Sequence, residues 1–201
     1  MKKILALMMA LLCVSLMFTA CGANGNRSDA AQTNPTGNPS VSNSDKTTPE
    51  TESQELEKRV AKDDAQMQTD DPAMPTRVIE NGTRINLHFG DTVLPGILND
   101  CDTAKALIDM LPYTVHMNSY SHDFCGVMPD DLPYNEDEVH YGWLNGDIDY
   151  AINAPYFTIL HSDEDISEQY GYQVNIGVLD CELSQIRELS GSFDVLIELA
   201  E

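Results

Sequence analysis

The feature that most constrains the fold of this chain is an abrupt change in composition near residue 78. The segment from Gly22 to Arg77 consists mainly of Asn, Ser, Thr, Gly, Pro, Asp and Glu, with few large apolar residues. Such a segment buries too little apolar surface to offset the entropy lost on folding. We therefore predict a disordered linker over residues 21–77 and a folded domain over residues 78–201.

Within residues 78–201, apolar residues alternate with polar ones at a spacing of two, which is the period of a β-strand. Ile85, Leu87 and Phe89 show this pattern first, with Asn86 and His88 between them. The pattern predicts strands over 85–89, 92–98, 113–118, 147–151, 156–161, 172–179 and 193–199.

Two short helices complete the predicted domain. The first is capped by Asp100 or Asp102 and stopped by Pro112, and the second is capped by Asp180 and ended by Gly191. The residues between the third and fourth strands resemble a loop. About seven strands and two short helices predict a mainly β fold, a small closed or half-closed β-barrel with helices at its ends.

The amino terminus carries a second strong signal. Lys2 and Lys3 precede an almost uninterrupted apolar stretch from Ile4 to Phe18. A basic start followed by an apolar stretch and small residues is typical of a secretory signal peptide. We predict such a peptide over residues 1–20.

The residues at the end of this peptide, Phe18 to Gly22, resemble the bacterial lipobox, with Cys21 as the modified residue. Two acyl chains on one cysteine suffice for stable anchoring in a bilayer. The sequence therefore predicts a lipoprotein attached through Cys21 to the extracytoplasmic face of a bacterial cell membrane. The alternative is an ordinary cleaved signal peptide followed by an incidental cysteine.

The charge of the chain restricts its partners. It has 33 acidic and 11 basic residues, which give a formal net charge of −22. Nucleic-acid phosphates and anionic lipid headgroups bind clustered Lys and Arg, so we expect no nucleic-acid partner. The expected partners are the membrane, through the lipid on Cys21, and an unidentified extracytoplasmic peptide, protein or small molecule.

Several short motifs follow one another along the predicted domain. They are residues 103–107 in the first helix; Met117, Asn118 and Tyr120; Gly146, Asp147, Ile148 and Tyr150; Phe157 and Ile159; and Ser167, Tyr170, Ile176 and Gly177. In this order and spacing, the segment from Ile85 to Glu198 resembles the bacterial cyclophilin-like domain family. The resemblance implies a half-closed eight-stranded barrel similar to that of cyclophilin.

Cyclophilin isomerases depend on an arginine beside an apolar, aromatic pocket. The basic residues of the predicted domain are Arg84, Lys105 and Arg187, and none falls on an expected pocket strand. Where many relatives have an arginine before a Leu-Gly or Ile-Gly pair, this chain has Asn175. We therefore expect a binding or interaction domain without isomerase catalysis. The alternatives are a peptidyl-prolyl isomerase-like extracytoplasmic enzyme and a subunit of a larger envelope complex.

The sequence contains no recognisable metal or cofactor motif. Its five histidines show neither His-x-x-x-His nor His-Glu-x-x-His spacing, and its acidic runs do not match a calcium-binding loop. We predict no cofactor, no metal site and no catalytic residue. Cys101, Cys125 and Cys181 are expected to be free thiols, although one disulfide remains an alternative in a secreted chain.

Polar and aromatic residues near the expected mouth of the barrel form the candidate ligand site. Asn118 and Tyr120 end the third predicted strand, Tyr141 and Trp143 flank an acidic loop, and Asn175 precedes the Ile-Gly pair. Amphipathic aromatic side chains at such a place bind a peptide or a sugar, or they simply plug the end of the barrel.

Overall fold

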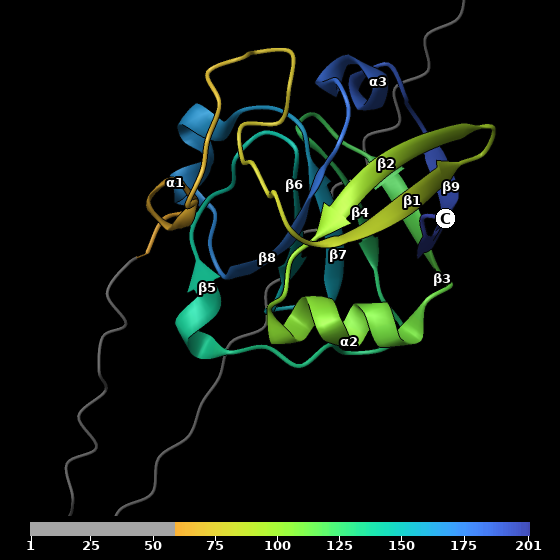
Figure 1. The fold of residues 1–201 in the computed structure, drawn as a ribbon, viewed down its shortest axis with the longest axis horizontal. Coiled ribbons are helices and arrows are strands. Elements are labelled where there is room, and N and C mark those ends of the chain that lie inside the picture. Colours follow the sequence, from red (N-terminus) through yellow and green to blue (C-terminus); the bar gives the residue numbers. More distant parts are fainter. Residues whose placement is uncertain (1–58) are drawn as a thin grey trace, which may run out of the picture. The chain divides into compact units, whose positions relative to one another are not determined.

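The computed structural model describes residues 59–201. The predicted signal peptide, Cys21 and most of the predicted linker lie outside these residues. The described chain contains nine strands in one antiparallel sheet (Figure 1). The strands are β1 (Thr83–Phe89), β2 (Thr92–Leu98), β3 (Tyr113–Ser119), β4 (Asp123–Val127), β5 (Val139–His140), β6 (Asp147–Ala151), β7 (Tyr156–Leu160), β8 (Gln173–Leu179) and β9 (Ser192–Leu199).

Eight of these strands close into a barrel. They follow the order β2-β1-β9-β3-β4-β7-β6-β8, and a further pairing between β2 and β8 joins the two ends. In that pairing Gly96 lies opposite Leu179 and Leu98 lies opposite Gly177. β5 adds to β8 outside the closed circuit. The predicted mainly β barrel is thus confirmed, in its closed form.

The alternation seen in the sequence separates the interior from the surface. Ile85, Leu87 and Phe89 on β1 point inward and are at most 1% exposed. The Phe89 ring packs edge-on against Phe124 at a centroid distance of 5.1 Å, and against Phe193 at 5.5 Å. Burial of such side chains contributes about 1.5–3 kcal/mol each, so the interior of the barrel is its hydrophobic core.

Two of the helices lie at opposite ends of the barrel, as predicted (Figure 1). In α2 (Asp102–Met110) the cap is Cys101, whose Sγ accepts the Ala104 N–H at 3.3 Å, so the prediction of an aspartate cap was wrong. α3 (Leu183–Arg187) is shorter than predicted. Asp180 does not cap it, since its carboxylate pairs with Arg84 at 2.7 Å.

The predicted loop over residues 121–145 contains two strands that the sequence pattern did not reveal. β4 lies between β3 and β7, and β5 follows the 3₁₀ helix η1 (Glu136–Glu138). β4 has only two buried residues, Phe124 and Gly126. β5 has only two residues, too few to show an alternation of apolar and polar side chains. A Cβ at Gly126 would lie 2.4 Å from the His116 carbonyl oxygen, so close packing requires glycine where an apolar residue would have marked the strand.

The structure also differs from the predicted boundary at residue 78. Residues 59–77, which we call the strap, pack on the barrel and contain the short helix α1 (Ala61–Asp64). Backbone hydrogen bonds hold the strap: Thr76 N donates to the Asn145 carbonyl at 2.8 Å, and Leu183 N donates to the Ala73 carbonyl at 2.8 Å. The strap is polar because backbone hydrogen bonds and polar side chains attach it to the barrel, and a composition argument detects neither.

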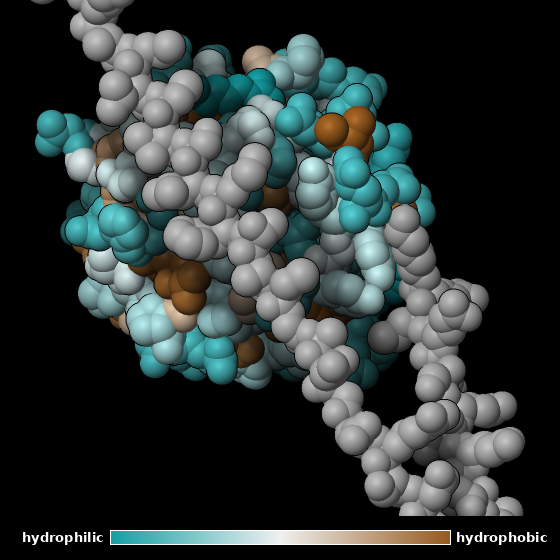
Figure 2. Space-filling model, turned by 180° about the vertical axis from the view of Figure 1, so that it is seen from behind, coloured by the Kyte–Doolittle hydropathy of each residue, from teal (hydrophilic) through white to brown (hydrophobic). Residues whose placement is uncertain are grey.

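One face of the described part is largely hydrophilic. Figure 2 shows polar residues over most of one face, with apolar residues gathered in small patches. Within residues 59–201, every helix is too short or too polar to cross a bilayer.

Candidate functional site

A buried ion pair fastens the strap to the barrel. The Arg77 guanidinium donates from Nε to Asp147 Oδ1 at 2.7 Å and from Nη2 to Oδ2 at 2.9 Å. Asp147, at the start of β6, is completely buried and Arg77 is 8% exposed. Asp147 Oδ2 also accepts the Leu144 N–H at 2.9 Å. The two side chains are thus fixed relative to each other, and the positive charge of Arg77 lies directly against the negative charge of Asp147.

The ion pair changes the electrostatics of its neighbours. Burial alone would lower the pKa of Arg77, but Asp147 and Asp149 outweigh burial and raise that pKa. Asp149 is fully buried, and burial together with the Asp147 charge raises the pKa of its carboxyl well above the usual value. The two neighbouring carboxyl groups of Asp147 and Asp149 therefore share one guanidinium, and the Asp149 pKa shift follows from burial beside the charge of Asp147.

His140 is a second buried polar residue near the Arg77–Asp147 ion pair. It is 2% exposed, and burial lowers the pKa of its imidazole. Among the described residues, neither ring nitrogen has a hydrogen-bond partner. Because the ring is 2% exposed, both of its nitrogens are shielded from solvent.

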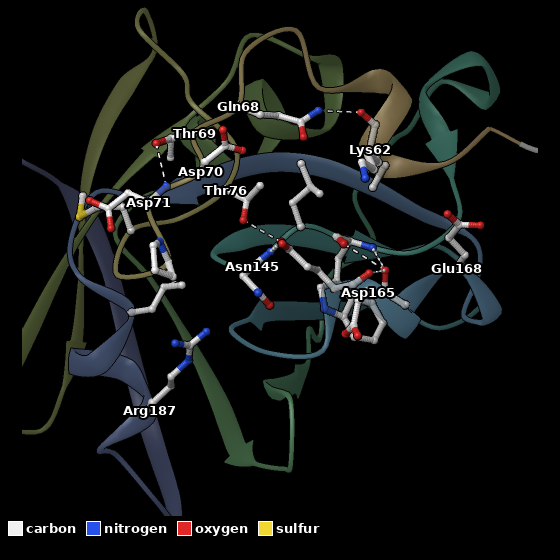
Figure 3. Close-up of a pocket in the computed structure, with 18 of the residues that line it drawn as sticks. Lys62, Gln68, Thr69, Asp70, Asp71, Thr76, Asn145, Asp165, Glu168 and Arg187 are labelled. Carbon is white, nitrogen blue, oxygen red and sulfur yellow. Dashed lines mark hydrogen bonds between the residues drawn. The ribbon is translucent and has the colours of Figure 1, made fainter.

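The first of two large cavities lies between the strap and the barrel, and Figure 3 shows the residues that line it. This strap cavity has a volume of about 680 Å³. Thr76 Oγ1 and the Asn145 N–H both donate to Glu164 Oε2 at 2.7 Å, which joins the strap to the 3₁₀ helix η2 (Glu164–Gln169). The side chains around the cavity are mainly polar: Lys62, Gln68, Thr69, Asp70, Asp71, Asp165, Glu168 and Arg187.

A second cavity of about 670 Å³ contains Asn175, and we call it the Asn175 cavity. The Asn175 amide donates to Asp149 Oδ1 at 2.9 Å and to the Gly177 carbonyl at 2.8 Å, and its oxygen accepts from Asn99 at 3.3 Å. This amide is engaged in the barrel wall, with both its donors used. It therefore serves the structure of β8 rather than presenting a reactive group.

The five predicted ligand-site residues do not share one surface. Tyr141 and Trp143 line the strap cavity, and Asn175 lines the other. Asn118 and Tyr120 lie at the end of β3 and line neither cavity. Asn118 Oδ1 accepts from Ser192 Oγ at 2.6 Å, whereas Tyr120 is 59% exposed.

The two aromatic residues of the strap cavity are held by contacts within the domain. Trp143 is buried, and its Nε1 donates to the Ser162 carbonyl at 2.8 Å. The Tyr141 ring lies 5.2 Å from that of Tyr172. Sequence reasoning missed the strap residues that face them. No pattern in the sequence indicates these residues, because their contacts are tertiary: a Cβ at Gly146, for example, would lie 2.4 Å from the Cβ of Pro75.

The described cysteines are free and poorly suited to nucleophilic chemistry. Burial raises the pKa of Cys125 to about 12 and that of Cys181 to about 11, and it also raises the pKa of Cys101. These thiols are protonated near pH 7. In the part of the chain that the structure describes, no three His, Cys, Asp or Glu side chains converge as metal ligands.

The fold and its cavities define a class: a small closed β-barrel domain with two polar cavities beside an attached strap. A family model for the cyclophilin-like family matches residues 87–198. The chain belongs to the cyclophilin-like family, and the resemblance found in the sequence is confirmed. The strap precedes the matched region.

Other comparisons add little. A search of curated proteins gave no match. Among solved structures, the chain is similar to the solution structure of the hypothetical protein AF2241 from Archaeoglobus fulgidus, with 18% sequence identity and a TM-score of 0.49. That alignment covers 61% of this chain and 100% of the other.

Proposed function

We propose that this protein is a membrane-anchored extracytoplasmic lipoprotein whose cyclophilin-like domain binds a peptide, protein or small-molecule ligand without isomerase catalysis. The observation that carries the proposal is the position of the arginines. An isomerase of the cyclophilin type needs a guanidinium that is available beside an apolar pocket, and here the best-placed guanidiniums are already engaged.

Three arginines line the two large cavities. Arg59 lines the Asn175 cavity, and its Nε and Nη2 donate to Asp64 Oδ1 at 3.2 and 2.9 Å. Both bonded nitrogens of Arg77 donate to Asp147, in the buried contact between the strap and the barrel wall. Arg187 lines the strap cavity, but its Nε donates to the His161 carbonyl at 2.8 Å. The carboxylates and amides that line this cavity offer hydrogen bonds to a ligand, as binding sites do. They do not offer the apolar seat that a proline ring needs.

A protease-coupled isomerisation assay tests the absence of catalysis. The full chain, purified in detergent, is added to a peptide that the protease cleaves only when its prolyl bond is trans. We expect the rate of the slow phase to equal the uncatalysed rate. An acceleration that scales with protein concentration, and that Arg187→Met abolishes, would favour the isomerase alternative.

The anchoring part of the proposal rests on the lipobox around Cys21. Metabolic labelling of bacterial cells with an alkyne analogue of palmitate tests it. We expect the full chain to take up label and to sediment with membranes. The Cys21→Ser variant should do neither, while Cys101→Ser, as the matched control, should be labelled normally. Equal labelling of both variants would contradict lipidation at Cys21.

A further inference from the structure

Asparagine is followed directly by glycine at three places in the sequence: Asn24-Gly25, Asn81-Gly82 and Asn145-Gly146. The first pair lies outside the described residues. In such a pair the backbone nitrogen of the glycine can attack the side-chain amide of the asparagine, because glycine has no Cβ to shield that nitrogen. Asparagine is one of the thermolabile residues of proteins. The structure distinguishes the two described pairs by the access that each glycine nitrogen has to the amide.

The pair Asn81-Gly82 is open to this attack. Both residues are exposed and lie in a bend just before β1. Within residues 59–201, neither the Asn81 side-chain amide nor the Gly82 N–H makes a hydrogen bond. The Asn81 side chain can therefore turn toward the backbone, and the Gly82 nitrogen is available as a nucleophile.

The packing of the β1–β2 hairpin requires glycine at position 82. A Cβ there would collide with the Leu98 carbonyl oxygen and with the Ile97 side chain at the end of β2. This close approach lies beside the first pair of the hairpin, in which Thr83 faces Leu98. The contact that closes the hairpin thus also keeps a glycine after Asn81.

The pair Asn145-Gly146 has the same sequence but is protected. Gly146 is buried, and its N–H donates to the Leu160 carbonyl at 2.6 Å. The Asn145 N–H donates to Glu164 Oε2 at 2.7 Å, and Asn145 Oδ1 is inaccessible to solvent. The Gly146 nitrogen must lose its hydrogen bond before it can attack, so reaction at Asn145 requires local opening of the fold.

We propose that Asn81 is a site of spontaneous deamidation, which converts its amide into a carboxylate in the wall of the Asn175 cavity. The Gly82 nitrogen loses its proton to hydroxide and forms a bond to Asn81 Cγ, and the amide nitrogen takes up a proton and leaves as ammonia. Water then opens the cyclic imide at either of its two carbonyl carbons, and the Gly82 nitrogen regains a proton. The net reaction consumes one water and releases one ammonia without oxidation or reduction, and its products are aspartate and isoaspartate.

The reaction changes one wall of the Asn175 cavity. Asn81 lines this cavity together with Glu80 and Glu138, so the new carboxylate adds negative charge to a wall that is already acidic. In isoaspartate the backbone passes through Cγ, which lengthens the chain by one atom directly before β1. Gly82 has no spare space toward Leu98 to accommodate that atom. The inference goes beyond the proposed function and does not depend on it.

Peptide mapping of the full chain in detergent tests the proposal. Samples are held at pH 8 and 37 °C, either folded or unfolded in guanidinium chloride, and are then digested. Trypsin cleaves after Arg77 and Arg84 and so releases Asn81 in a short peptide, whereas chymotrypsin excises Asn145 between two aromatic residues. Replacement of ammonia by water adds about 1 Da. In the folded chain we expect Asn81 to gain this mass at least about tenfold faster than Asn145, and in guanidinium chloride we expect similar rates.

The matched control is Asn81→Gln, which keeps the amide but would have to form a less favourable six-membered ring. The peptide of residues 78–84 from this variant should keep its mass. The same peptide from the aged original chain should be a substrate for an isoaspartyl methyltransferase, whereas that from Asn81→Asp should not. Equal rates at Asn81 and Asn145 in the folded chain overturn the proposal. So does a peptide of residues 78–84 that gains mass only in guanidinium chloride.

Discussion

Replacing Arg77 by methionine should strongly destabilise the barrel, although Arg77 precedes the first strand. The substitution keeps the length of the side chain but leaves the Asp147 carboxylate buried with only the Leu144 N–H as partner. Removing one partner of a buried ion pair costs about 3–5 kcal/mol. The matched control is Arg84→Met, because the Arg84–Asp180 pair is equally short, at 2.7 Å, but exposed. An exposed pair contributes at most about 1 kcal/mol.

Urea unfolding of the full chain, followed by Trp143 fluorescence, measures both effects. With a slope of about 1–3 kcal/mol per molar urea, Arg77→Met should lower the midpoint by about 2 M, and Arg84→Met by less than about 0.5 M. Adding Asp147→Asn to Arg77→Met should recover part of the loss, because no unpaired charge then remains. Equal midpoints for the two single variants would refute the conclusion that this ion pair supports the fold.

Three further predictions concern the strap, the histidines and the thiols. Gly146→Ala should cost about 1–3 kcal/mol more than Gly191→Ala by urea unfolding, since both glycines have φ near 95° but only Gly146 faces Pro75; equal costs would contradict that contact. Burial lowers the pKa of His161 to about 4, so the unfolded chain takes up a proton below pH 6.5 that the folded chain does not, and stability falls. The stability of His161→Asn relative to the original chain should therefore rise by about 1–2 kcal/mol between pH 7 and pH 5, and a constant difference would exclude this titration. Mass spectrometry after treatment with iodoacetamide at pH 8 should find Cys125 and Cys181 unmodified in the folded chain and modified in urea, because their pKa values are about 12 and 11; rapid labelling without urea would show that burial does not protect them.

Most strands of the barrel could be predicted from the sequence. Alternation of Ile85, Leu87 and Phe89 with polar residues predicts β1 because burial on one side of a strand imposes a period of two. The same reasoning fails for β4, where the close approach of His116 requires Gly126 and removes an inward-facing side chain. It also fails at the start of α2, where a cysteine takes the place of the usual Ser, Thr, Asp or Asn cap.

The strap and the cavities could not be predicted in the same way. The partners Arg77 and Asp147 are far apart in the sequence, and a single arginine in a polar segment gives no sign that it will be buried. Trp143 and Tyr170 were noted in the sequence for separate reasons, but their contact depends on how the chain between β5 and β8 folds. Composition and periodicity describe neighbours along the chain, whereas these sites are built from tertiary contacts.

The central claim is that the folded domain begins at the strap and not at the first strand. Hydrogen exchange of the full chain, read by mass spectrometry on peptides covering residues 59–78, tests it most directly. The Ala61, Thr76 and Val78 amides are hydrogen-bonded at 2.8–2.9 Å, so they should exchange as slowly as the amides of the β6–β8 sheet. Exchange of these peptides at the rate of an unfolded chain, with the barrel still protected, would contradict the claim.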